Sequence, residues 1–233
     1  MAESTEVLEE KKIKVKEREP LFSKKNKKLI SDPLDENNPI TIQVLGICSA
    51  LAVTVQMKAA VVMSVAVLFV LILANVSISL IRNLIPNRIR IIVQLVVVAA
   101  LVIIVDQVLK AYLFDVSKEL SVFVGLIITN CIIMGRLEAF ALGNKPWPSA
   151  LDAIGNSLGY GMVLVIVSFF KELFGSGKLF GFEIFGNATE QTGLYAMGYM
   201  DNGLMLLPPS SLIIVAVYIW VQKIRNPSLI ESH

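Results

Sequence analysis

The sequence predicts an all-α polytopic membrane protein with six transmembrane helices, and two observations support this fold class. Of the 233 residues, 55% are hydrophobic and 17% are charged, a balance that soluble domains rarely reach. Apolar runs long enough to cross a bilayer, which takes about 20 residues for about 30 Å of hydrocarbon, recur along most of the chain. The expected spans are residues 39–56, 59–81, 89–109, 120–140, 151–174 and 203–222.

The spans differ in strength along the chain. The second and third are long and almost purely apolar, whereas the apolar part of the fourth covers only residues 120–134. Pro208 and Pro209 lie near the start of the sixth span and should break its first turn, because proline cannot continue a helical hydrogen-bond ladder.

Charged residues close two of the spans. Arg136 and Glu138 follow the fourth apolar run, and Lys171 and Glu172 end the fifth. Long charged side chains at such positions usually reach the membrane surface. We therefore expect both pairs to be interfacial anchors.

The ends of the chain are polar. Residues 1–38 hold nine Lys or Arg and nine Asp or Glu residues, which predicts a largely disordered cytoplasmic tail. The membrane domain is expected over residues 39–225, followed by a C-terminal tail, 226–233. With six spans, 16 of the 21 Lys and Arg residues lie on the side of the two termini. This distribution predicts that both termini are cytoplasmic, and it explains the basic charge without a nucleic-acid partner.

The two cysteines of the chain lie in corresponding places of two halves. Cys48 is in the first span and Cys131 in the fourth, so the chain should run in opposite directions through the membrane at the two sites. This layout is typical of an inverted repeat, here with halves of about 39–110 and 120–224, whose interface often carries the functional site.

Helix-breaking residues accompany both cysteines. Gly46 stands two residues before Cys48, while Thr129 and Asn130 directly precede Cys131. We expect the first and fourth helices to be broken or half-length, which is tolerated in a membrane where the irregular backbone is buried or lines a cavity. A continuous helix that uses Gly46 for close packing is the alternative.

The residues around the thiols allow two interpretations. Buried cysteines are often inert packing. Alternatively, Cys48 and Cys131 are half of a soft-metal site, because an iron–sulfur cluster normally needs four cysteine ligands and a second chain would supply the others. The single histidine, His233, leaves no histidine-based zinc or haem site within the chain.

Four stretches resemble one family of membrane proteins. That family is the D subunit of the Na⁺-translocating NADH:quinone oxidoreductase (Nqr), with the E subunit of the Rnf complex as a near relative. The resemblance begins at about residue 34 and is interrupted mainly around 182–202. It rests on QVLGICSALAVT (43–54), SLIRNLIPNRIRIIVQ (79–94), VGLIITNCIIMGRLEAFAL (124–142) and LDAIGNSLGYG with KELFGSGKLFG (151–181).

The resemblance implies a role for both thiols. In the family, the cysteine of the first span and that of the TNC motif ligate a [2Fe–2S] cluster, and the paralogous E subunit of Nqr supplies the second pair. The matching residues are Cys48 and Cys131, and Asn130 could donate a hydrogen bond to a cluster sulfur. The family complex also contains the A, B, C and F subunits in the bacterial inner membrane. It passes electrons from NADH through FMN, FAD and iron–sulfur centres to quinone and exports Na⁺, with no catalytic residue expected in this chain.

Two carboxylates near the ends of spans are candidates for cation handling. Asp106 lies four residues before Lys110, and Asp152 lies three residues after Ser149. An ion pair on one helix face and a capping box are the structural alternatives. Na⁺, however, is a hard cation that prefers oxygen ligands, and carboxylates in or near spans often serve ion pathways.

Other interpretations of the chain differ in the partners they require. Membership of Rnf would place it in a ferredoxin-linked complex, whereas an independent transporter built on the inverted repeat would need neither partner nor iron. A structural subunit would use its cysteines for packing alone. Gly155 and Gly159 have the GxxxG spacing of close helix packing, against this chain or a partner.

Overall fold

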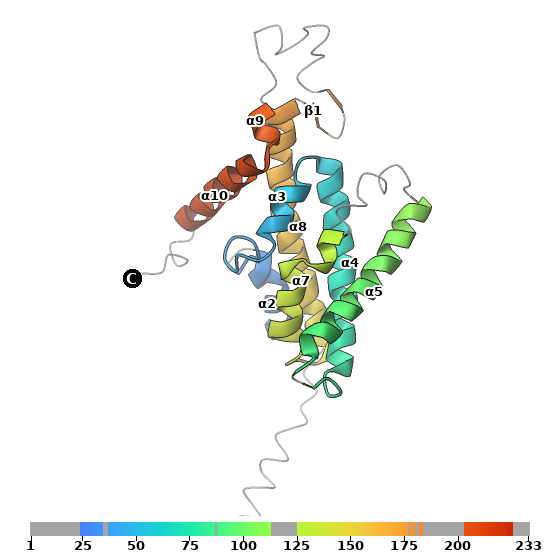
Figure 1. The fold of residues 1–233 in the computed structure, drawn as a ribbon. Coiled ribbons are helices and arrows are strands. Elements are labelled where there is room, and N and C mark those ends of the chain that lie inside the picture. Colours follow the sequence, from blue (N-terminus) through green and yellow to red (C-terminus); the bar gives the residue numbers. More distant parts are fainter. Residues whose placement is uncertain are drawn as a thin grey trace, which may run out of the picture.

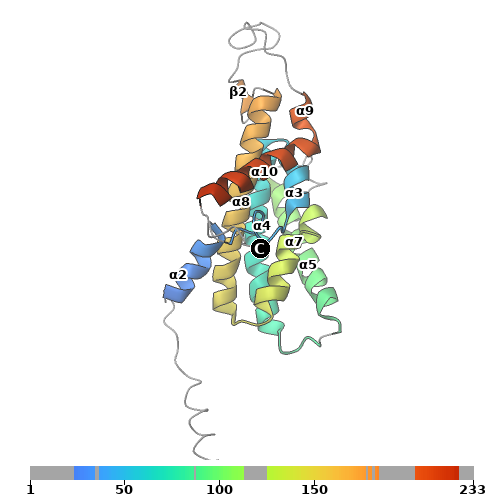
Figure 2. The same cartoon turned by 90° about the vertical axis from the view of Figure 1, so that its left-hand side faces the viewer.

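Two long antiparallel helices, α4 (Met57–Ile81) and α8 (Pro146–Ser176), form the centre of the computed structural model (Figures 1 and 2). The structure describes residues 24–34, 37–86, 88–112, 125–176, 178–179, 182–183 and 203–225. Apolar residues spaced three or four apart give α4 a buried face along its length. These buried residues are Ala60, Met63, Val67, Val70, Leu71, Ala74 and Ile78.

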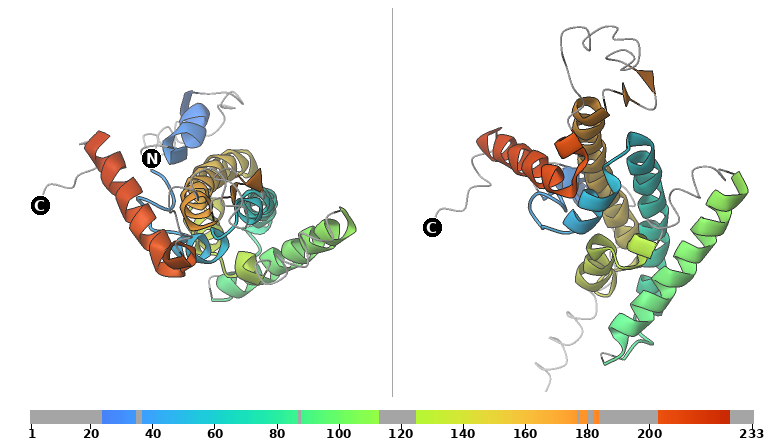
Figure 3. Two further views of the ribbon diagram at one scale, coloured as in Figure 1. Left: turned by 90° about the horizontal axis from the view of Figure 1, so that it is seen from above. Right: turned by 45° about the horizontal axis from the view of Figure 1, so that its top comes forward.

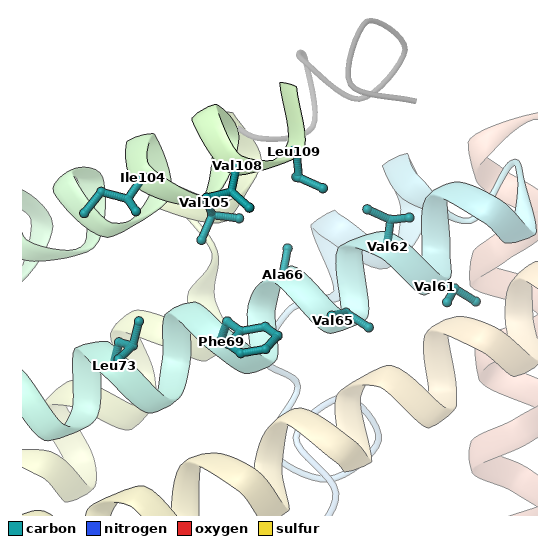
Figure 4. Close-up of a pocket in the computed structure, with 10 residues that line it drawn as sticks. All are labelled: Val61, Val62, Val65, Ala66, Phe69, Leu73, Ile104, Val105, Val108 and Leu109. Atoms are coloured by element: carbon teal, nitrogen blue, oxygen red, sulfur yellow. The ribbon is translucent and has the colours of Figure 1, made fainter. Parts of the chain in front are cut away.

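The next helix, α5 (Arg90–Tyr112), leans away from this pair (Figures 1 and 3). It buries a single stripe, formed by Gln94, Val98 and Val102 at four-residue spacing. Towards its C-terminal end, α5 and α4 enclose a groove of about 400 Å³ (Figure 4). Its lining, which includes Phe69 and Ile104, is apolar and offers no oxygen ligand to a cation.

Two short helices begin at breaks in the backbone. One is α3 (Ile47–Val53), which leads into α4. The other is α7 (Cys131–Arg136), which follows a helical turn at 125–128, continues into a π-helical segment, η2 (Leu137–Ala141), and leads into α8. The two short helices run in opposite directions from neighbouring starts, as do the long helices that follow them (Figure 1). An inverted repeat requires this opposite direction.

The end of the described chain is helical as well. Two antiparallel strands of two residues each, β1 (Lys178–Leu179) and β2 (Phe182–Glu183), follow α8. The short α9 (Gly203–Leu206) comes next, followed by α10 (Pro208–Arg225). The interruption at residue 207, immediately before Pro208 and Pro209, is the predicted break. The first turns of α10 contact α3 and α8, and its other end extends away from them (Figure 1).

Three of the predicted spans are clear in the described part of the chain. They are α4, α5 and the part of α8 up to Gly175, which are long and apolar enough to cross a membrane. The total of six crossings and the repeat relation of the two halves remain predictions. Residues 1–23, 113–124 and 226–233 lie outside the described residues, and with them most of the predicted tails and the start of the fourth span.

The glycine pair on α8 packs against the chain's own N-terminal segment. Two short elements, α2 (Lys24–Ser31) and η1 (Asp32–Leu34), lie across it, although the sequence placed them in the tail. A Cβ atom on Gly155 would lie 2.6 Å from the Leu29 carbonyl oxygen, and one on Gly159 would lie 2.3 Å from the Pro33 carbonyl oxygen. The GxxxG spacing therefore serves a contact within the chain.

Gly159→Ala should detach this segment. The added methyl group would collide with the backbone at Pro33, which cannot move like a side chain, so we expect a destabilisation of about 1–3 kcal/mol. Thermal unfolding and proteolysis of residues 24–34 in the purified protein measure it. Gly143→Ala is the control, because its nearest neighbour would be 3.9 Å away. Equal behaviour of the two variants would contradict this packing.

Candidate functional site

The thiols of Cys48 and Cys131 lie next to each other. Their sulfur atoms are 4.0 Å apart, although 83 residues separate them in the sequence. Both cysteines are free and exposed, so the sulfurs are open to a group or chain outside this one. A spacing of 4.0 Å is about twice the length of a disulfide bond.

An irregular segment positions Cys48. Val44 has φ 57° and Gly46 has φ 84°, so the backbone twice enters the left-handed region before α3 begins. A β-branched residue such as Val44 rarely adopts this conformation, and such strain often accompanies functional sites. The buried Asn38 side chain supports the segment by accepting from the amide of Ile40 at 3.0 Å and donating to the carbonyl of Gly159 at 3.2 Å.

Asn130 starts the helix that carries Cys131. It is buried and extended, and its side-chain oxygen accepts from the amide of Ile132 at 3.3 Å, so it is the N-cap of α7. Gly135 on this helix leaves room for Leu45, whose methyl carbon would be 3.0 Å from a Cβ there. The helix breaks inferred from Gly46 and Asn130 are therefore present. Asn130 caps α7 and so makes the second break, and a hydrogen bond from Asn130 to a cluster sulfur stays a prediction.

A fully buried tyrosine joins the two irregular segments. The hydroxyl of Tyr160, on α8, lies 2.6 Å from the Ser49 hydroxyl and accepts from the Asn130 side-chain amide at 3.3 Å. Sequence reasoning missed Tyr160 and Ser49. The available signal was a polar tip within the apolar fifth span, because a buried tyrosine hydroxyl usually finds a partner.

Asp152 lies within α8 and is an ion-pair partner. The helix begins at Pro146, so Ser149 is already inside it and donates to the Lys145 carbonyl; the predicted capping box is wrong. The Asp152 carboxylate is buried and accepts from two nitrogens of Arg136, one of them at 3.0 Å, and from Asn156 at 3.1 Å. Its charge is therefore compensated by a guanidinium.

Asp106 is far from Asp152 in the fold. It lies in the last two turns of α5, whose C-terminal end and the start of α8 are at opposite ends of the molecule (Figure 1). Its carboxylate accepts from Lys110 at 2.5 Å, as the spacing predicted. The structure thus keeps the two carboxylates apart, each with a basic partner. Within the described residues, no group of three or more Cys, His, Asp or Glu side chains could hold a metal.

The interpretation of the terminal charges as interfacial anchors is wrong for the fifth span. Lys171 is fully buried and donates to the Ser211 hydroxyl at 2.9 Å. Glu172, which is also buried, accepts from the Met57 amide at the start of α4 at 2.6 Å. An acid at the N-terminus of α4 is favourable. The Ser211 hydroxyl also lies 3.3 Å from the hydroxyl of Thr54, which ends α3, so Lys171 and Glu172 lie on either side of the turn between α3 and α4.

The charges that close the fourth span also have internal partners. Arg136 pairs with Asp152, as described above. Glu138 pairs with Arg90 and accepts from Gln94 at 3.1 Å, which ties η2 to the first turns of α5. Glu138 and Arg90 are partly exposed, so this contact stabilises less than the Arg136 pair.

Comparisons with known proteins agree with this arrangement of apolar helices. The family described as "Rnf-Nqr subunit, membrane protein" matches residues 26–219. The chain belongs to the Rnf-Nqr family. A relative in Photobacterium profundum, the D subunit of the Na⁺-translocating NADH-quinone reductase, is 53% identical over 210 residues, which cover 90% of this chain and 98% of the relative. The predicted resemblance to the D subunit is confirmed, and this Rnf-Nqr chain is a membrane protein.

Arg136→Met should destabilise this Rnf-Nqr protein strongly. It would leave the buried Asp152 carboxylate without its guanidinium, which typically costs about 3–5 kcal/mol. Lys110→Met is the matched control, because it removes the partner of Asp106 at a more exposed site, where a pair is worth less than about 1 kcal/mol. Thermal unfolding in detergent measures both. Similar losses of stability in the two variants would refute the unequal importance of these pairs.

Proposed function

We propose that this chain is a membrane subunit of a Na⁺-translocating NADH:quinone oxidoreductase and that Cys48 and Cys131 are two of the four ligands of a [2Fe–2S] cluster. The paralogous E subunit would supply the other two. The observation that carries the proposal is the pair of exposed thiols 4.0 Å apart at the starts of two opposed helices. The identity of 53% to the D subunit favours Nqr over Rnf.

The spacing of the thiols suits a metal. A tetrahedral metal with metal–sulfur bonds of about 2.3 Å holds two sulfur ligands roughly 3.8 Å apart. The 4.0 Å separation is close to this value, so both thiolates fit a single metal ion without a large change of backbone. Inert packing does not explain why both thiols are exposed and turned towards each other.

The ligand set within the described chain is incomplete. Two sulfurs are half of a cluster's usual complement, and no third Cys, His, Asp or Glu joins them among the described residues. Because the thiols are exposed, a second chain can reach them. A paralogue with the same opposed half-helices would present a matching pair across a pseudo-two-fold axis.

When bound, the cluster would supply a one-electron relay within the membrane, which shortens the distance electrons must cross. The residues of this chain would hold the relay, with Cys48 and Cys131 as ligands and Asn130 shaping the start of α7. We propose inner-membrane localisation with both termini cytoplasmic. NADH, FMN, FAD and quinone would bind elsewhere in the complex, whose A, B, C and F subunits are further partners.

Asp106 and Asp152 remain proposals for Na⁺ handling. Each has a basic partner that a passing cation would have to displace or compete with. Because they lie near opposite ends of the bundle, they suit separate places where Na⁺ enters and leaves better than one Na⁺ site shared by both.

Removal of either thiol should remove iron from the complex. Cys48→Ala and Cys131→Ala are each expected to lose about two iron atoms per complex, because a [2Fe–2S] cluster rarely survives without one of its four ligands. Iron analysis and electron paramagnetic resonance of the purified complex measure this. The control is Ser64→Ala, which removes a small polar group that bonds to the Ala60 carbonyl of its own helix. Full iron content in both cysteine variants would refute the cluster, and Na⁺ transport by this chain alone in liposomes would favour the transporter.

The partner should cover the thiols. In the isolated chain, a maleimide should label Cys48 and Cys131 readily, because both are exposed. In the assembled complex we expect a strong fall in labelling, even after iron has been removed. Mass spectrometry of the two sites measures the difference. Equal labelling in both states would contradict a shared site.

A further inference from the structure

A single side chain connects the residues that flank the two thiols. Ser49 directly follows Cys48, Asn130 directly precedes Cys131, and the Tyr160 hydroxyl contacts both, at 2.6 and 3.3 Å. We propose that Tyr160 is a positioning residue whose hydroxyl sets the separation of Cys48 and Cys131. The effect of this hydroxyl on a bound cluster rests on the proposed function, whereas its effect on the distance between the thiols does not.

The hydrogen bonds form a connected series in which the donor and the acceptor of each bond are determined. Ser49 donates its hydroxyl hydrogen to the Gly46 carbonyl at 2.7 Å, so it has no hydrogen left for Tyr160. Tyr160 must therefore donate to Ser49 while it accepts from the Asn130 amide. This series of hydrogen bonds runs from the N-cap of α7 to the turn before α3, and the two hydroxyls in it each donate one bond and accept another. Such linked hydrogen bonds reinforce one another in a buried setting.

The ring of Tyr160 has a separate task. Its Cε2 atom would lie 3.0 Å from a Cβ on Gly46, so the ring packs directly beneath the left-handed turn. Tyr160→Phe would keep this contact and remove only the hydroxyl. Ser49 could still donate to Gly46, and Asn130 could still cap Ile132.

The hydroxyl joins the residues directly beside the thiols. Among the described residues, one other side-chain hydrogen bond joins the segment before α3 to α7, from Arg136 to Gln43 at 3.4 Å, and it lies at the far end of α7 from Cys131. Without the hydroxyl, each short helix would keep its own start but lose the polar link beside the thiols. The expected result is a broader range of distances between the sulfurs, with little change in overall stability.

The test measures how well the two thiols act together. The purified full chain carrying each variant, without partner subunits or iron, is titrated in detergent with phenylarsine oxide, an arsenical that bonds two thiols at once; both thiols are exposed in this chain. Tyr160→Phe should weaken this binding about fivefold, the effect of one net hydrogen bond, while labelling of single thiols by maleimide stays within about twofold. The control is Tyr112→Phe, which removes the same atom from a residue that is 84% exposed at the end of α5.

A second arm uses the iron-loaded complex. The iron centre that depends on Cys48 is followed by electron paramagnetic resonance. Its line shape and its midpoint potential should both shift in Tyr160→Phe and stay unchanged in Tyr112→Phe. A purely structural role would lower the amount of the signal without altering either property. If iron proves independent of Cys48 but the arsenical affinity still falls, the proposed function fails and the positioning role stands.

Ser49→Ala provides an independent variant in case Tyr160→Phe assembles poorly. It removes the other hydroxyl of the link, so the arsenical affinity should fall by a similar factor, with Ser64→Ala as its control. Unchanged arsenical affinity in both Tyr160→Phe and Ser49→Ala would overturn the proposal.

Discussion

Helix breaks in an apolar bundle free backbone hydrogen-bonding groups where little water is at hand, and the structure is arranged to satisfy them. The breaks before α3 and α7 bring two helix starts together, which a continuous helix could not do. Asn38 and Asn130 satisfy nearby amides, and Tyr160 links the two breaks. The antiparallel α4 and α8 supply the rigid surface on which this irregular backbone rests. The close approach of the thiols depends on that support.

Charged residues also help to hold the two thiol-bearing helices in place. Glu172 accepts from the first amide of α4, and Lys171 reaches the end of α3 through Ser211 of α10. Arg136 with Asp152 joins the end of α7 to the start of α8. Each thiol-bearing helix is thus fixed at its far end by a charge from α8 and at its near end by a hydrogen-bonded break. Such pre-organisation is what a metal site requires, because ligands that are already placed lose little entropy when the metal binds.

The sequence predicted the long helices α4, α5 and α8 well, because apolar runs of this length form membrane-spanning helices. It also predicted the breaks beside the cysteines, since Gly46 and Asn130 favour irregular backbone. It could not predict the partners of Lys171 and Glu172, because a charge at the end of an apolar run looks the same whether it meets lipid headgroups or a buried helix turn. Tyr160 was missed for a similar reason: a tyrosine in a span suits either an interface or a polar link.

Replacement of one thiol by a nitrogen ligand tests the proposed metal site most directly. Cys131→His, and separately Cys48→His, would put an imidazole where a thiolate is expected, and histidine ligation of [2Fe–2S] centres raises their potential. Pulsed electron paramagnetic resonance of the purified complex detects a nitrogen bound to the iron. A nitrogen coupling with a raised midpoint potential in either variant is the predicted result. An unchanged iron signal, with no nitrogen coupling in either variant, would show that these thiols do not bind the cluster.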